Sequence, residues 1–194
     1  DPKVPTTFEE AWDNPDPEEK KKWRKAITKE MNDAIKRGIY KKIKKKDVPK
    51  DKRCIKTKWV FKIKRNGIYR ARSVACGYSQ IPGVDFEESF SPVINDVTWK
   101  ILIILKLIYG LEAKLIDIET AFQHGDLDVD IYMNTPKGLK FFMNIKDDEC
   151  VQLMKCTYGL VQSTRQFKVK VYCTLFGWGV EGVYIDRCVV SIGT

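Results

Sequence analysis

The amino-acid sequence predicts an α+β fold, with helices alongside an antiparallel sheet. Residues 17–37 repeat apolar side chains every three or four positions, which is typical of an amphipathic helix. Residues 55–63 alternate in period two with basic side chains, and Asn66-Gly67 then supplies a strong hairpin signal. With 194 residues, of which 43% are hydrophobic, the chain can bury one sizeable core or a main body with a smaller subdomain.

The first predicted helix has clear signals at both ends. Asp16 can cap its N-terminus, Pro17 suits the first helical position, and two glutamates follow in the first turn. Gly38 ends the apolar pattern. The outer face of this helix is strongly basic, and we expect residues 40–53 to be a charged connector.

The hairpin that follows has two possible registers. A two-residue loop would pair Lys64 with Tyr69 and place Arg70 and Arg72 on the face opposite the lysines of the first strand. A bulge at Gly67 would instead bring all these basic side chains together on one face. The sequence leaves both registers open.

The second half of the chain alternates predicted helices and strands. Asn95 and Asp96 resemble the cap of a helix over about 97–109, which is apolar on most sides and therefore expected to be buried. Residues 113–118 are predicted to form a buried central strand that carries Asp117. Two further strands and one helix are expected in the segments DIYMNTP, CVQLMKCTYG and STRQFKVKVYCTLFGW.

Charge is distributed unevenly along the chain, whose formal net charge is +9. The first 80 residues hold 24 lysines and arginines against 11 acidic residues, whereas the remainder holds 11 against 15. A solvated lysine-rich surface is one interpretation. The density of basic residues between positions 20 and 72, with aromatic residues among them, favours a nucleic-acid or phosphate contact.

Several functional classes are disfavoured. Six scattered cysteines and the single His124 do not form a zinc-binding pattern. The most apolar run, residues 101–111, is too short to cross a bilayer and contains a lysine, so we expect no membrane partner. We expect an intracellular protein, and the absence of an initial methionine suggests a piece of a longer one.

Asp117 is the most unusual residue of the chain, because it lies within an apolar run. No lysine or arginine occurs within ten positions downstream, so a buried carboxylate here would have no local partner. Either the strand ends there and the carboxylate reaches solvent, or Asp117 is a metal ligand.

Three motifs resemble the reverse transcriptase of copia-type retrotransposons: KWVFKIKRNGIYRARSVACGYSQIPGVDFEESFSPV, IDIETAFQHGDLDVDIYM and YGLVQSTRQF. They occur in the order and spacing of that family, and the resemblance covers roughly residues 8–190. It implies a right-hand polymerase with an antiparallel palm sheet backed by helices, incomplete at the C-terminus. Residues 1–50 would be a basic N-terminal helical arm, 51–95 the fingers hairpin and loop, and 96–194 a partial palm.

The resemblance also implies roles for individual residues. Asp117 matches the first metal-binding aspartate, and Ile118 would offer its backbone carbonyl to the second of two Mg²⁺ ions. The remaining implied nucleotide-binding residues are Lys64 and Arg72 at the triphosphate, Phe122 under the sugar, and Gly159 and Gln162 against nucleotide and template.

This chain departs from the family pattern in one important respect. The family pairs its first aspartate with two others in a Tyr-x-Asp-Asp hairpin, which this sequence lacks. Asp147 and Asp148 are adjacent but are expected to form a surface cluster, and Asp186 matches only the run-up to the missing hairpin. Polar residues at usually apolar or proline positions, namely Ser73, Gln123 and Thr164, are further departures.

The function implied is that of a reverse transcriptase fragment, with two-metal nucleotidyl transfer in the intact parent and no activity expected from this chain alone. Its expected partners are an RNA or DNA template-primer, deoxynucleoside triphosphates and the remainder of the Pol polyprotein. The expected location is the cytoplasm, in a virus-like particle, or the nucleus. Two alternatives remain: an inactive retroelement remnant that binds nucleic acid through its basic arm, and a structural domain whose basic face meets a protein.

Overall fold

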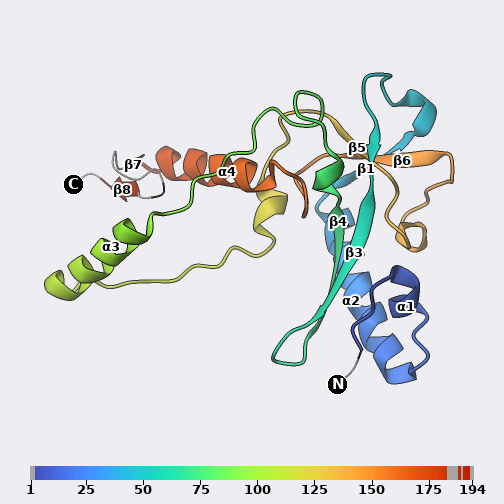
Figure 1. Cartoon of the computed structure of the whole chain (residues 1–194), viewed down its shortest axis with the longest axis horizontal. Helices are drawn as coiled ribbons and strands as arrows, with labels where there is room; N and C mark the ends of the chain where they lie inside the picture. The colour runs from blue at the N-terminus through green and yellow to red at the C-terminus, as the bar shows by residue number, and fades with distance from the viewer. Residues whose placement is uncertain (1–2, 183–187, 189, 193–194) are drawn as a thin grey trace.

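Helices and small sheets form a main body with an extension to one side (Figure 1). The computed structural model describes residues 3–182, 188 and 190–192. The body contains α1 (Phe8–Trp12), α2 (Pro17–Lys36), β1 (Tyr40–Lys44), β2 (Cys54–Ile55), β3 (Thr57–Ile63), β4 (Tyr69–Ala75), β5 (Ile131–Met133) and β6 (Glu149–Leu153). The extension contains α3 (Asp96–Tyr109), α4 (Ser163–Gly177), β7 (Val180–Gly182) and β8 (Val190–Ile192). The predicted α+β class is confirmed at this level.

Helix α2 begins and ends where the sequence predicts. The Asp16 carboxylate accepts hydrogen bonds from the backbone N–H groups of Glu18 and Glu19, at 2.8 and 3.2 Å. The apolar side chains of α2 are buried against the hairpin β3–β4, where Trp23 meets the Phe61 ring edge-to-face at 5.4 Å. The buried side chains of α2 and of the hairpin belong to one hydrophobic core.

The hairpin β3–β4 adopts the bulged register. Lys62 pairs with Arg70, and the Lys64 N–H donates to the Ile68 carbonyl at 2.9 Å. Gly67 has φ of +77°, a left-handed conformation that glycine adopts without strain. Since side chains alternate between the two faces of a strand, the basic residues share the face opposite to the buried Trp59 and Phe61.

The larger sheet has the strand order β1-β6-β5-β2. Two of its pairs are antiparallel, but β2 and β5 run parallel, so the predicted purely antiparallel sheet is wrong in this detail. The charged connector expected over residues 40–53 is also wrong at its start, because Tyr40–Lys44 is strand β1. This segment forms a strand because it pairs with β6. Lysines are common on an edge strand, where they discourage pairing with another chain.

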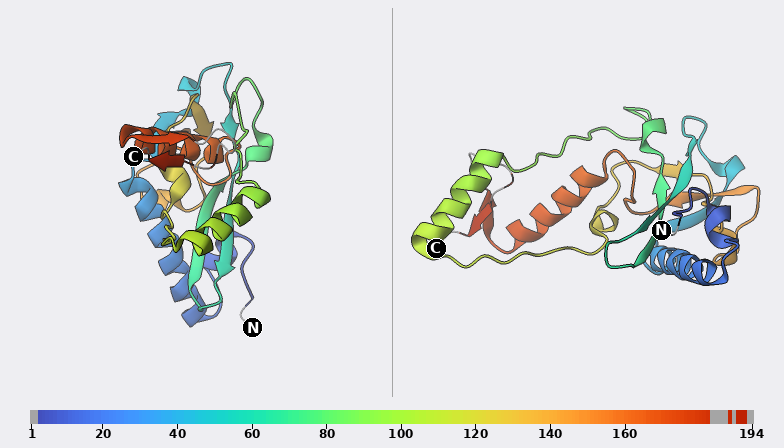
Figure 2. Two further views of the ribbon diagram at one scale, coloured as in Figure 1. Left: turned by 90° about the vertical axis from the view of Figure 1, so that its left-hand side faces the viewer. Right: turned by 60° about the horizontal axis from the view of Figure 1, so that its bottom comes forward.

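The helix predicted near residue 97 is confirmed as α3, capped by the Asn95 side chain, but its predicted burial is wrong. None of its residues is buried, and Figure 2 shows it at the end of the molecule remote from α1 and α2. The central strand expected over residues 113–118 is likewise absent. Leu115 is 100% exposed and Ile116 82% exposed, because no described strand pairs with this segment.

Three further predicted elements are present. The segments DIYMNTP and CVQLMKCTYG contain β5 and β6, and the last predicted helix is α4. Among the described residues, every helix is too short or too polar to cross a membrane.

Candidate functional site

Three segments distant in sequence meet around Tyr158. The Arg72 guanidinium, from β4, stacks over the Tyr158 ring with 4.2 Å between its carbon and the ring centroid. The Phe122 ring approaches the same tyrosine edge-to-face at 5.8 Å. Stacking of this kind fixes a guanidinium while leaving its in-plane N–H groups free to bind a phosphate.

The position of Phe122 is set by the short 3₁₀ helix η3 (Ala121–His124) and by α4. Thr120, just before η3, has φ of +53°, an uncommon conformation for a residue other than glycine. On its other side Phe122 contacts Phe167 of α4, with ring centroids 6.5 Å apart and planes nearly perpendicular. The aromatic residue predicted to pack under a sugar therefore contacts the same tyrosine as Arg72.

Gly159 holds this segment against β4. Its φ is +88°, and a Cβ at this position would lie 2.1 Å from the Ala75 carbonyl oxygen, so no larger residue fits. The Ala75 N–H donates to the Tyr158 carbonyl at 2.8 Å. Gly159 thus allows a close backbone approach to the hairpin, and its contact with nucleotide and template stays a prediction.

Gln162 is fully buried and takes part in a local network. Its amide nitrogen donates to the Asp85 carbonyl at 3.0 Å, and its amide oxygen accepts from Gln80 at 3.1 Å. The Gln80 side chain in turn accepts from the Val161 N–H. Gln162 therefore fixes the loop around Asp85 to the start of α4, and its contact with nucleotide or template stays a prediction.

Lys64 borders a hollow of about 180 Å³ next to the Arg72–Tyr158 pair. The hollow lies between α2, the hairpin and residues 119–120. Its charged lining consists of Lys29, Glu30, Asp33, Lys64, Arg70 and Glu119. The structure thus brings Lys64, Arg72, Phe122 and Gly159 into one region of the surface.

Glu30 is a charged residue of this region that the sequence did not single out. Burial raises the pKa of its carboxyl from the ordinary 4.5 to about 7, although a hydrogen bond from the Ser73 N–H and the charges of Arg72 and Arg70 oppose the rise. The Ser73 N–H donates to the carboxylate at 3.2 Å. Burial likewise raises the pKa of the neighbouring Tyr40 to about 12.

Two of the polar departures from the family pattern have different surroundings. Ser73 is buried, but its side chain forms a hydrogen bond with Tyr40. Gln123 is also buried, and its amide oxygen has no hydrogen-bond partner among the described residues. Such an oxygen costs roughly 1 to 3 kcal/mol, so the departure at Gln123 is the costly one.

Asp117 and Ile118 lie in the exposed irregular segment before Thr120, and no contact joins them to the Arg72–Tyr158–Phe122 cluster among the described residues. Within the described ranges no three His, Cys, Asp or Glu side chains come together as they would around a metal ion. Asp147 and Asp148 are exposed in the turn before β6, as predicted, and Asp186 falls outside the described residues. A single exposed carboxylate does not fit the needs of a two-Mg²⁺ centre.

Comparison with known proteins identifies the family. Residues 40–189 match the family of reverse transcriptases (RNA-dependent DNA polymerases). The chain therefore belongs to that family, and within it to the reverse transcriptase domains of copia-type retrotransposon Pol polyproteins. No solved structure matches the chain.

The relatives are much longer proteins. The retrovirus-related Pol polyprotein from transposon TNT 1-94 of Nicotiana tabacum is 37% identical over 97% of this chain, which spans 14% of that protein. The Pol polyprotein from transposon RE2 of Arabidopsis thaliana is 31% identical over 77% of the chain and 10% of its own length. The transposon Ty1-DR5 Gag-Pol polyprotein of Saccharomyces cerevisiae is 29% identical over 77% of the chain and 8% of its own length.

Proposed function

We propose that this chain is the part of a copia-type reverse transcriptase that receives the incoming deoxynucleoside triphosphate and the template-primer. In this proposal it contributes the fingers and part of the palm of a right-hand polymerase, and the rest of the Pol polyprotein supplies the remainder. The observation that carries the proposal is the Arg72–Tyr158–Phe122 cluster, which unites three family motifs at one place.

The cluster offers what a nucleoside triphosphate needs. The Nε atom of Arg72 is buried and has no hydrogen-bond partner among the described residues, so a phosphate would bind the other N–H groups of this guanidinium. Lys64 and Arg70 extend the positive charge along the same face of the hairpin. An arginine held flat by stacking can donate two hydrogen bonds to a phosphate, and Phe122 is the nearby surface for the sugar.

The described residues do not supply a full set of ligands for the metal ions of the family. Reverse transcriptases generally use Mg²⁺, which prefers several convergent oxygen ligands, whereas among the described residues Asp117 belongs to no group of three or more such side chains. We therefore derive the binding of nucleotide and nucleic acid from this chain, and no catalytic step. The ligand roles of Asp117 and of the Ile118 carbonyl remain predictions.

Binding of a fluorescent deoxynucleoside triphosphate to the Arg72→Ala variant tests the proposal. We expect the affinity to fall about tenfold or more, because hydrogen bonds to charged groups contribute about 1.5 to 3 kcal/mol. Arg65→Ala removes an equal charge from the exposed hairpin turn and serves as the matched control, with little change expected. Equal losses in the two variants would show that only net charge matters, and would contradict the proposal.

A further inference from the structure

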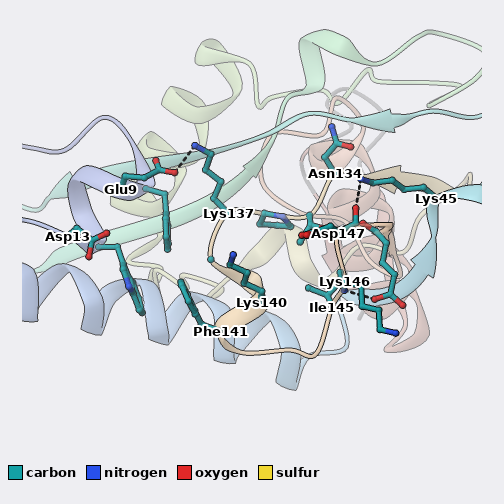
Figure 3. A pocket seen from close by; sticks show the side chains of 16 residues that line it. Glu9, Asp13, Lys45, Asn134, Lys137, Lys140, Phe141, Ile145, Lys146 and Asp147 are labelled. Carbon is teal, nitrogen blue, oxygen red and sulfur yellow. Dashed lines mark hydrogen bonds and ion pairs between the residues drawn. The ribbon is translucent and has the colours of Figure 1, made fainter.

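A second hollow, of about 700 Å³, lies on another part of the body, between α1 and residues 134–149 (Figure 3). None of the predicted nucleotide-binding residues lines it. Its walls come from α1, from the loop that contains the 3₁₀ helix η4 (Leu139–Phe141), and from the turn before β6. It is therefore distinct from the site around Tyr158.

One wall of this hollow is a stack of three aromatic rings. Trp12 lies nearly parallel to Phe8, with centroids 5.5 Å apart and planes 16° apart. Phe141 stacks on Trp12 at 5.2 Å and 7°. Phe141 is nevertheless 56% exposed, so a flat ring of a ligand can continue the stack on it.

The stack is held in place before any ligand binds. Gly138 approaches the Phe8 ring so closely that a Cβ there would lie 2.3 Å from its Cζ atom. The Trp59 indole N–H donates to the Lys137 carbonyl at 3.0 Å, and the Lys137 side chain forms an ion pair with Glu9 at 2.7 Å. A rigid aromatic surface loses little conformational entropy on binding.

The charges around the hollow favour an anion. Three of its four carboxylates have ion-pair partners: Glu9 with Lys137, Asp13 with Lys20 and Arg24, and Glu149 with Lys42. The Lys45 ammonium group donates to the backbone carbonyl of Asp147 at 2.7 Å. In the described part of the chain, Lys140 and Lys146 form no ion pair with a carboxylate, and the exposed Asp147 is the fourth carboxylate of the hollow. Lys140 directly precedes Phe141 in the chain and both line the hollow (Figure 3), so a cation and a stacking surface border the same space.

We propose that this hollow binds an unpaired polynucleotide strand, with one base stacked on Phe141 and the neighbouring phosphates near Lys140 and Lys146. Aromatic platforms beside basic side chains bind single strands with little sequence preference, because every base presents a flat face. The inference deepens the proposed function by giving the template a second contact away from the nucleotide site.

Fluorescence anisotropy of a labelled 12-nucleotide oligo(dT) with the whole chain tests this proposal. We expect Phe141→Ala to weaken binding about tenfold, equivalent to about 1.4 kcal/mol. Affinity for a polynucleotide falls as salt rises, and Lys140→Ala should make the plot of log affinity against log salt concentration less steep by about 0.7. This is the change expected from the loss of one phosphate contact on a single strand. Phe90→Ala, which removes a ring that is 72% exposed in a different loop, is the control and should change neither quantity.

Equal affinities for the Phe141→Ala and Phe90→Ala variants would overturn the proposal, as would equal sensitivity to Phe141→Ala for a DNA duplex of the same length. Displacement of the oligonucleotide by polyglutamate, with no effect of Phe141→Ala, would assign the hollow to acidic protein segments instead.

If circular dichroism shows that Phe141→Ala unfolds the chain, the salt dependence of the Lys140→Ala variant tests the proposal in its place. Loss of triphosphate binding in Arg72→Ala alongside unchanged oligonucleotide binding in Phe141→Ala would leave the proposed function intact and refute only this inference.

Discussion

At the scale of single residues, the family motifs predict which side chains matter but not what surrounds them. Arg72, Phe122 and Gly159 were predicted from the sequence, and the structure brings all three to Tyr158. Tyr158 was not singled out, although it is the first residue of the third family motif, YGLVQSTRQF. Glu30 was missed for a similar reason, since its burial arises from the hairpin packed across α2 and not from its neighbours in sequence.

The raised pKa of Glu30 predicts a pH-dependent stability. The folded chain keeps the Glu30 proton up to about pH 7, whereas the unfolded chain releases it near 4.5, so the free energy of unfolding falls as pH rises between these values. Glu30→Gln should remove this loss and be more stable than the parent by about 1 to 3 kcal/mol at pH 8, with the difference vanishing near pH 4. Urea denaturation across this range measures it, and parallel pH profiles for the two chains would contradict the assignment.

At the scale of elements, local signals were reliable wherever a cap or turn determines the structure. Asp16, Pro17 and Gly38 marked both ends of α2, and Asn66-Gly67 marked the hairpin. Helix α1 was missed although Thr7 caps it, accepting from the Glu10 N–H in a Thr-x-x-Glu pattern that could have revealed it. Strand β1 could not be predicted from its lysines, because pairing with β6, more than 100 residues away, produces it.

The junction between β4 and the Tyr158 segment gives a prediction at this scale. Gly159→Ala should destabilise the chain by about 2 kcal/mol or more, because the new methyl group would meet the Ala75 carbonyl and the left-handed backbone disfavours alanine. Gly177→Ala, near the end of α4 with open space around it, is the matched control and should be neutral or slightly stabilising. Thermal unfolding compares them, and an unchanged midpoint for Gly159→Ala would show that the junction does not hold the site.

At the scale of the whole molecule, the body and the extension differ in how well sequence predicts them. The core of the body follows the apolar periodicity of α2 and β3. The sequences of α3 and of residues 113–118 are equally apolar, and both segments were predicted to be buried. Both are exposed, because no described element covers them. Burial is a property of the assembly of elements, so a periodicity within one segment cannot establish it. Asp117 lies in that uncovered segment, so the buried position predicted for it is also not observed.

Primer extension on an RNA template with Mg²⁺ tests the central claim most directly. It compares this chain with the same chain continued through a family Tyr-x-Asp-Asp hairpin, and with Asp117→Ala in the continued chain. We expect only the continued chain to incorporate nucleotides and Asp117→Ala to abolish incorporation, because removing a metal ligand costs several kcal/mol at the transition state. Primer extension by the 194-residue chain alone, or full activity of the Asp117→Ala variant, would contradict the account.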